Sequence, residues 1–209
     1  MPASERKTMR VYVPATIPML RDLVADRELR AFGGTAFALT PALREAYASG
    51  DDEELSEVAM GEAARAALRL IAAERDALTS DDTADAAAEK SEEPSDDSTV
   101  ADAEPARPAP RSSGPVYRRA VVAADVTGVT LRPDLDDAVV RLSGPISYDR
   151  IASVHVDLAE AEPAVAKAVD VIDAADLGDP DAEFVLGDAE DHQLAWYAAQ
   201  ELPFLLDLL

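Results

Sequence analysis

The chain contains no cysteine, only two histidines and three lysines, and aromatic residues make up 5% of its 209 residues. The absence of cysteine excludes disulfide bonds, thiolate metal sites and a cysteine nucleophile, and it is neutral about the cellular compartment. No apolar run approaches the roughly 20 residues of a membrane-spanning helix, and the first ten residues lack the hydrophobic stretch of a signal peptide. We therefore expect a soluble, cytoplasmic protein that does not bind membranes.

Positive charge is also scarce, because 19 Lys and Arg face 42 Asp and Glu and leave a net charge of −23. The imbalance is greatest in residues 115–209, where 6 basic side chains stand against 19 acidic ones for a net charge of −13. Binding to nucleic acid requires clustered Lys and Arg, so this composition argues against a nucleic-acid partner. An acidic surface that receives a basic protein, or that imitates nucleic acid, is the alternative that the charge leaves open.

Residues 79–115 interrupt the folding signals of the chain. Asp, Glu, Ala, Ser and Pro replace the branched and aromatic residues that would offset the entropy of ordering a chain. We expect a disordered acidic and proline-rich tether here, and a flexible extension over residues 1–8. The folded domain is then divided into a first half, residues 9–78, and a second half, residues 116–209.

The apolar patterns of the two halves predict a mixed α/β domain with one central sheet. We expect strands at residues 10–14, 35–39, 120–123, 139–142, 153–158 and 194–198, and a short helical turn at 145–151. Helices are expected after Thr16, after Thr40-Pro41, from Asp51 toward Ala77, from Glu162 to Gly178, and at the apolar C-terminus.

The expected elements of the second half repeat the order of the first, strand-helix-strand-helix. The closest correspondence aligns Glu57-x-x-Met60-Gly61-Glu62-Ala63 with Glu183-x-x-Leu186-Gly187-Asp188-Ala189. An alanine-rich chain also produces such matches by chance, so both readings stay open. A true duplication predicts two units around a pseudo-twofold, with a binding groove between them.

Six segments together resemble an uncharacterised family of actinobacterial proteins classed as a domain of unknown function. They are MRVYVPAT, TPALREAYASGD, VVAADV, LSGP, VHVD and GDAEDHQLAWYAAQELPFLL. The resemblance covers nearly all of the chain outside the first eight residues and the tether, and it implies no activity, cofactor or catalytic residue.

The two histidines are the candidate chemical groups, because each lies close to carboxylates in the sequence. His155 is two residues before Asp157, which places both on one face of a strand, and His192 follows Asp191 directly. Such pairs could act in acid-base chemistry or contribute half of a metal site. A histidine bonded to a neighbouring acid at a strand end is the structural alternative, and we predict no catalytic residue, metal or cofactor.

Trp196 and Tyr197 form the densest aromatic spot of the chain. We expect Trp196 to be largely buried beside Leu194 against the C-terminal helix, with Tyr197 on the opposite face; a ligand-stacking role is the alternative for Trp196. Arg118-Arg119 is interpreted as a solvated strand end, or as an anion contact. The apolar C-terminus is expected to pack within its own chain, with a homodimer contact as the alternative.

No phosphate-binding loop, nucleophile elbow or calcium-binding loop occurs in the sequence. The leading functional hypothesis is therefore a non-enzymatic interaction protein with a protein partner. The alternative is a small-molecule-binding protein or hydrolytic enzyme that uses His155, Asp157, Asp191 and His192 in a groove between the halves, with Trp196 and Tyr197 as binding residues.

Overall fold

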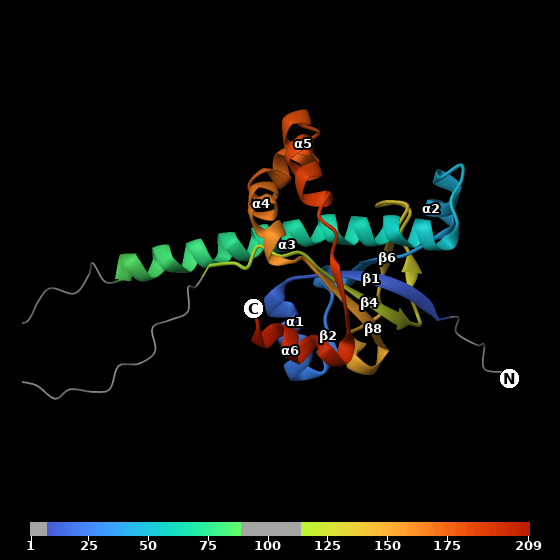
Figure 1. Cartoon of the computed structure of the whole chain (residues 1–209), viewed down its shortest axis with the longest axis horizontal. Helices are drawn as coiled ribbons and strands as arrows, with labels where there is room; N and C mark the ends of the chain where they lie inside the picture. The colour runs from blue at the N-terminus through green and yellow to red at the C-terminus, as the bar shows by residue number, and fades with distance from the viewer. Residues whose placement is uncertain (1–7, 89–113) are drawn as a thin grey trace, which may run out of the picture. The chain divides into compact units, whose positions relative to one another are not determined.

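The structure is a computed structural model that describes residues 8–88 and 114–209, and among these the side chains of residues 8–80 and 114–209. Two compact units divide the chain: one consists of the residues up to Ala72 and from Val116 onward, and the other spans Ala73–Pro115. The first unit contains the central sheet and the helices that cover it, and the fold and site below belong to it (Figure 1).

The central sheet has seven antiparallel strands in the order β5-β6-β3-β1-β4-β8-β9. A two-stranded antiparallel ribbon pairs β2 with β7. The strands of the large sheet are β1 (Met9–Ala15), β3 (Thr35–Phe37), β4 (Ala120–Val126), β5 (Thr130–Leu131), β6 (Val139–Arg141), β8 (Ile151–Val156) and β9 (Ala195–Ala198). The ribbon consists of β2 (Glu28–Leu29) and β7 (Ile146–Ser147).

One face of the sheet is covered by α1 (Ile17–Asp26) and α6 (Leu202–Asp207) (Figure 1). Thr16 begins α1 as its N-cap, because its hydroxyl accepts a hydrogen bond from the Met19 N–H. The largest apolar cluster of the unit lies on this face, where alternate residues of β1, β4 and β8 meet the buried side chains of both helices. Alternation explains why only every second residue of β1 and β4 joins this cluster. In β8, Ile151 joins Val154 and Val156 because the register shifts at this point of the β4–β8 pair.

The other face packs against the N-terminal half of α3 (Asp52–Ala88). Small side chains, Ala59 and Ala63 among them, let this helix approach Phe37, Val121 and Val139 of the sheet closely. Asp51 stabilises the start of the helix by accepting hydrogen bonds from the Glu53 and Glu54 N–H groups. The short helix α2 (Pro41–Ala46) is capped in the same way by Thr40.

A hairpin of α4 (Glu162–Asp176) and α5 (Pro180–Glu190) packs against α3 further along its length. Leu68 and Ile71 of α3 meet Val165, Ile172 and Leu186 in a cluster of its own. The hairpin turns at Gly178, whose φ of 84° suits a residue without a side chain. This hairpin holds the end of α5, and hence the segment that leads into β9, beside α3.

The mixed α/β class with a single central sheet is confirmed. The strands of the second half, however, do not form a unit of their own. β3 and β1 of the first half occupy adjacent positions, whereas β5 and β6 of the second half flank them on one side and β4, β8 and β9 on the other. The two halves therefore share one sheet instead of forming two separate units.

The α3 helix is longer than the sequence predicted, because it continues to Ala88, past the expected start of the tether at Thr79. Alanine and acidic residues favour a helix that already has a nucleus, and the prediction did not weigh this continuation. Residues 89–113 of the expected tether, and residues 1–7 of the expected N-terminal extension, lie outside the described residues. Expected helical structure at residues 145–151 is present only as a single turn at Tyr148–Arg150, after β7.

The C-terminal helix packs within its own chain, as expected, since Leu202 and Leu205 are buried in the largest cluster. Phe204 and Leu208 point away from that cluster and are exposed. In the described part of the chain, no helix has the length and apolar character needed to cross a membrane.

Candidate functional site

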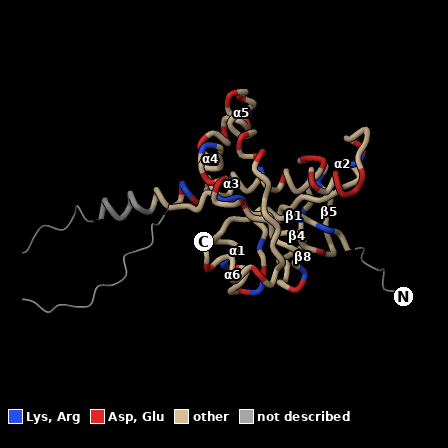
Figure 2. Tube along the Cα trace, viewed as in Figure 1, with Lys and Arg blue, Asp and Glu red and all other residues tan. Residues whose placement is uncertain are grey.

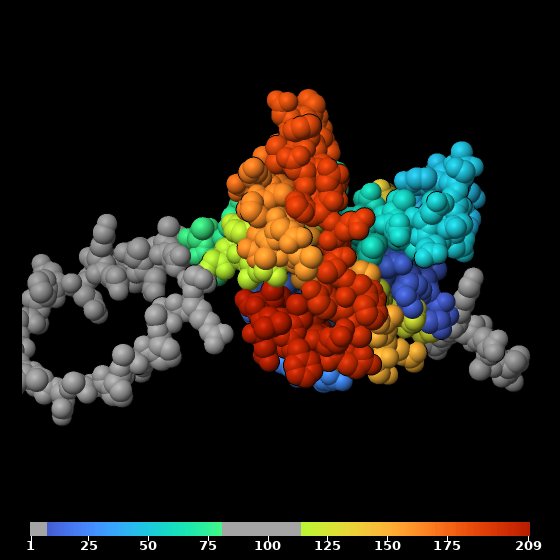
Figure 3. Space-filling model, viewed as in Figure 1, coloured from blue at the N-terminus to red at the C-terminus, as the bar shows by residue number. Residues whose placement is uncertain are grey.

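A cavity of about 660 Å³ opens between α3 and the edge of the sheet. We call it the α3–β9 pocket. Figure 3 shows the segment that follows α5, in orange-red, beside the N-terminal half of α3, in teal. The residues that line it are Glu57, Val58, Met60, Gly61, Glu62, Ala64, Arg65, Arg119, His155, Glu190, His192, Gln193, Leu194 and Trp196.

The pocket exists because α3 covers only part of its face of the sheet. Its apolar contacts reach β3, β1, β6 and Val121 of β4. Beyond β4 lie β8 and β9, the last two strands of the sheet. There the sheet contributes His155 and Trp196 to the pocket wall instead of to an apolar cluster. The volume lies within the range of small-molecule sites.

Trp196 is 60% exposed, so the expectation that it is buried against the C-terminal helix is wrong. The sequence correctly predicted that Trp196 and Tyr197 lie on opposite faces of β9, but it assigned each of them to the wrong face. Tyr197 is the residue that packs, partly buried, against the cluster that contains α6, and Trp196 lies on the α3 face with Leu194. Because β9 is the edge strand and α3 does not cover it, Trp196 has an open cavity beside it.

His155 is the direct cross-strand partner of Trp196 in the β8–β9 pair. Residues opposite one another in an antiparallel pair share a face, so the imidazole and the indole lie side by side on the pocket wall. The Nε2 atom of His155 is 3.1 Å from the Ser153 Oγ on the same strand. Burial, with a smaller contribution from the positive charge of Arg10, lowers the pKa of His155, so the imidazole is neutral at pH 7.

Asp157 does not pair with His155. Its carboxylate accepts hydrogen bonds from Arg119 Nε and Nη2, each at 2.8 Å, and from the Arg119 N–H at 2.8 Å. Both residues are buried, Arg119 at 2% and Asp157 at 1% exposure, so the solvated strand end expected for Arg119 is wrong. Since all polar atoms of this pair find partners, the charges are tolerated in the interior.

The same guanidinium also positions the turn that leads into β9, because Arg119 Nη2 donates to the His192 carbonyl oxygen at 2.7 Å. His192 itself lines the pocket with the residues that follow it. Asp191 is exposed at the end of α5 and is not part of the pocket wall. Of the six residues predicted as site candidates, the pocket thus brings together His155, His192 and Trp196, and it leaves out Asp157, Asp191 and Tyr197.

Three carboxylates enter the pocket wall: Glu57 and Glu62 from α3, and Glu190 from the end of α5. Burial raises the pKa of Glu62, and the negative charges of Asp136 and Glu190 act in the same direction against the opposing effect of Arg65 and Arg69. No hydrogen bond or ion pair within the described residues engages the side chains of Glu57 and Glu62.

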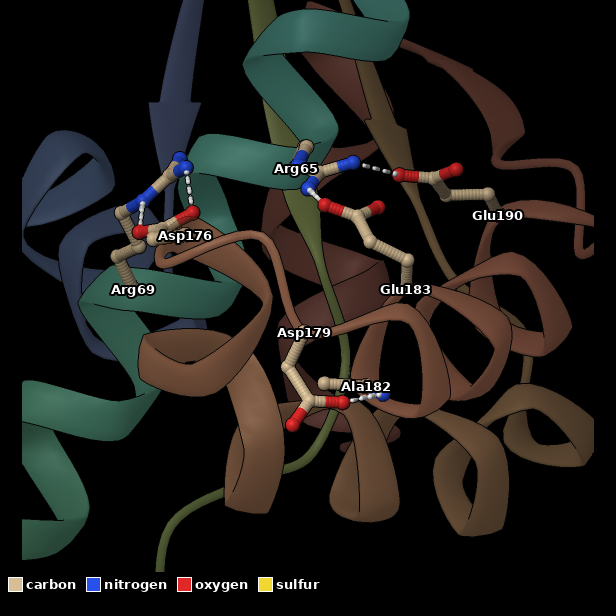
Figure 4. Close-up of polar contacts among 7 residues, drawn as sticks. All are labelled: Arg65, Arg69, Asp176, Asp179, Ala182, Glu183 and Glu190. Carbon is tan, nitrogen blue, oxygen red and sulfur yellow. Dashed lines mark hydrogen bonds and ion pairs between the residues drawn. The ribbon is translucent and has the colours of Figure 1, made fainter.

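The cations of the wall, by contrast, are all engaged. Arg65 donates to Glu183 at 2.7 Å and contacts Glu190 at 3.4 Å, and Figure 4 shows this guanidinium between the two carboxylates of α5. Arg69, which lies one helical turn after Arg65 on α3 and outside the pocket wall, donates two hydrogen bonds to the carboxylate of Asp176 on α4. Figure 4 also shows Asp179, which caps α5 by accepting from the Ala182 N–H. These contacts attach the α4–α5 hairpin to α3 and fix one wall of the pocket.

The surroundings of the pocket are predominantly acidic. Figure 2 shows Asp and Glu, in red, along α5 and around the start of α3. Across the described ranges, no three His, Cys, Asp or Glu side chains are grouped so that they could hold one metal ion. With Arg65 and Arg119 held by carboxylates, Glu57 and Glu62 leave the pocket with an excess of negative charge.

Sequence reasoning missed Glu57, Glu62 and Arg65 as pocket residues, although Glu57 and Glu62 stood in the segment that suggested a repeat. Their signal is that two acids flank Met60-Gly61 on a helix whose other face is apolar. Nothing in the sequence places that polar stripe over β8 and β9, because the position of α3 on the sheet depends on tertiary packing.

No curated protein and no solved structure shows significant similarity to the chain. A family model does match, and it covers residues 9–206. The chain belongs to DUF6912, a family of unknown function.

Proposed function

We propose that this member of the family is a cytoplasmic, non-enzymatic binding protein whose α3–β9 pocket receives a positively charged organic group, an ammonium or a guanidinium. The observation that carries the proposal is the composition of the pocket wall. It combines unpaired carboxylates with an exposed indole, while its own guanidinium groups are held by Glu183, Glu190 and Asp157.

The two kinds of group complement one cation in different ways. Glu57 and Glu62 offer charge-assisted hydrogen bonds to a donor. The face of Trp196 attracts a cation through the quadrupole of its ring. The neutral imidazole of His155 beside Trp196 adds no repulsion, since its lowered pKa keeps it uncharged at pH 7.

Trp196 makes the test direct, because it is the only tryptophan of the chain and its emission reports on the pocket itself. We expect Nα-acetyl-arginine methylamide and Nα-acetyl-lysine methylamide to change the emission saturably at low salt. Nα-acetyl-citrulline methylamide, which has the shape of the arginine compound without its charge, and citrate should not. A weaker response at high salt is also expected, because exposed charges are screened.

Variants on α3 distinguish cation binding in the pocket from nonspecific attraction to the acidic surface. Glu62→Gln and Glu57→Gln should each weaken cation binding, whereas Glu53→Gln, an exposed acid outside the pocket, should leave it unchanged. Equal responses to the capped arginine and the capped citrulline, or equal losses in all three variants, would contradict the proposal.

General acid-base chemistry, such as hydrolysis, is the second candidate. It is favoured by one observation: Glu62, whose pKa is raised, and His155, whose pKa is lowered, line the same cavity, so their two pKa values move toward one another. A His155–Asp157 pair cannot serve, since Asp157 is sealed against Arg119. Turnover of ester or amide substrates that is abolished in both Glu62→Gln and His155→Gln would establish this function over simple binding.

A further inference from the structure

The strand that forms the pocket wall, β9, is also a free edge of the sheet. Within the described residues it pairs with β8 on one side, and no other strand follows it in the sheet. Exposed edges in soluble proteins are usually protected by charges, prolines or extreme shortness. The opposite edge, β5, has only two residues and is followed by Arg132-Pro133, whereas Ala195–Ala198 contains neither a charge nor a proline.

A hydrogen bond at the last residue of β9 indicates which of its backbone N–H and C=O groups point toward β8 and which point toward the free edge. The Ala198 N–H is accepted by the Glu201 carboxylate, at 2.9 Å, and so points away from β8. Backbone groups of successive residues alternate in direction along a strand, so the N–H and C=O of Trp196 also point to the free edge. The side chain of this residue meanwhile forms part of the pocket. Trp196 thus combines an unpaired edge with the wall of an acidic cavity.

We propose that β9 accepts an extended segment of another protein as an additional strand, and that a Lys or Arg side chain of this segment enters the α3–β9 pocket. The inference rests on the proposed function, which it deepens by assigning the cation to a peptide. Main-chain hydrogen bonds to Trp196 would contribute affinity, and the pocket would select the charged side chain, as in other cases of strand addition.

Charge favours a basic partner over a second copy of this chain. Each chain has a net charge of −23, and pairing two β9 edges would bring two pockets with unpaired Glu57 and Glu62 toward one another. For a basic segment, in contrast, the acidic surroundings raise the rate of association and attract the bound side chain.

The experiment uses the full chain and a capped seven-residue peptide of alternating Val and Lys, followed by Trp196 fluorescence and by calorimetry. The peptide should bind at least tenfold more tightly than Nα-acetyl-lysine methylamide, and a peptide with Glu in place of Lys should not bind. Two isomers that are N-methylated on alternate residues test the edge. The isomer that is methylated on the N–H groups facing β9 should lose the gain, because those groups can no longer donate hydrogen bonds to the strand. The isomer methylated on the N–H groups that face away from β9 should keep it.

The outcomes distinguish the two proposals. If the single capped lysine binds as tightly as the peptide, or if both methylated isomers bind equally well, strand addition is wrong and the cation pocket stands. If neither peptide nor capped lysine binds, both proposals fail. Sedimentation of the free chain as a dimer that the peptide cannot dissociate would assign the β9 edge to a second copy and overturn the inference.

Discussion

Glu62 occupies a position at which burial works against its negative charge. Its raised pKa means that the folded chain holds the proton more tightly than the unfolded chain does. Stability from this residue is therefore fully present below the ordinary glutamate pKa and is lost as the pH rises through the raised value. A group retained at such a cost is expected to serve binding.

Replacing Glu62 with Gln should raise the melting temperature at pH 7, because the uncharged amide avoids the desolvation of a carboxylate. The gain should shrink as the pH falls toward the ordinary glutamate pKa, where wild-type Glu62 is also protonated. Thermal denaturation at pH 7 and pH 4 measures both effects, and Glu53→Gln is the matched exposed control. A lower melting temperature at pH 7 for Glu62→Gln would refute this account.

His155 shifts in the opposite direction and makes an opposite contribution. Because its pKa is lowered in the folded state, the unfolded chain binds the proton more readily just below the ordinary histidine pKa. The contribution of His155 to stability is therefore fully present above the ordinary histidine pKa, and it is lost as the pH falls through the lowered pKa of the folded state. His155→Gln, which can still bond to Ser153, should therefore flatten the dependence of melting temperature on pH between about 7 and 5. An unchanged pH dependence in the variant would show that His155 titrates normally.

Trp196→Ala should leave stability nearly unchanged, since most of the indole is exposed and its loss opens no internal cavity. We expect a decrease of no more than about 1 kcal/mol in the free energy of unfolding, measured with denaturant. Tyr197→Ala, on the packed face of the same strand, is the control and should cost more. In the native chain, tryptophan emission should resemble that of indole in water. A blue-shifted emission, or a large loss of stability in Trp196→Ala, would show that the indole is buried after all.

At the scale of elements, the Arg119–Asp157 pair joins the start of β4, the end of β8 and the turn before β9. Arg119→Met leaves a buried carboxylate without its partner, and such losses cost about 3 to 5 kcal/mol. The double variant Arg119→Met, Asp157→Leu should recover part of that stability, because no charge remains buried. Denaturant unfolding of the two single variants and the double variant forms the cycle. Equal stability of wild type and Arg119→Met would mean that the pair is not buried in solution.

The elements themselves were largely predictable. Local signals determine where they begin, such as the Thr16 and Thr40 caps and the proline that follows each helix start, and the structure uses them. The pocket was not predictable, because it depends on how far α3 reaches across the sheet. The alternating pattern correctly placed Trp196 and Tyr197 on opposite faces of β9. It could not show which face is covered, because helices distant in the sequence cover the sheet. Arg119 was misjudged for the same reason, since its partner Asp157 directly follows another strand, β8.

For the whole molecule, the three apolar clusters found in the described residues draw their members from the unit formed by the chain up to Ala72 and from Val116 onward. This unit should therefore fold without the acidic segment that separates its two parts in the sequence.

We expect deletion of Asp81–Pro110 to leave the cooperative unfolding transition and the cation response of Trp196 in place. Residues 73–80, which belong to α3, and residues 111–115 remain to connect Ala72 with Tyr117, and both of these pack against the cluster of α3, α4 and α5. The deletion removes the last turns of α3, which lie beyond the α3 residues found in the three clusters, and shortening the remaining connection changes its closure entropy by only about 1 kcal/mol. Thermal melting and Trp196 titration of the deletion variant beside the full chain provide the measurement. Loss of cooperativity would show that the deleted residues contribute to the core, whereas intact melting with a lost cation response would assign them to the binding surface.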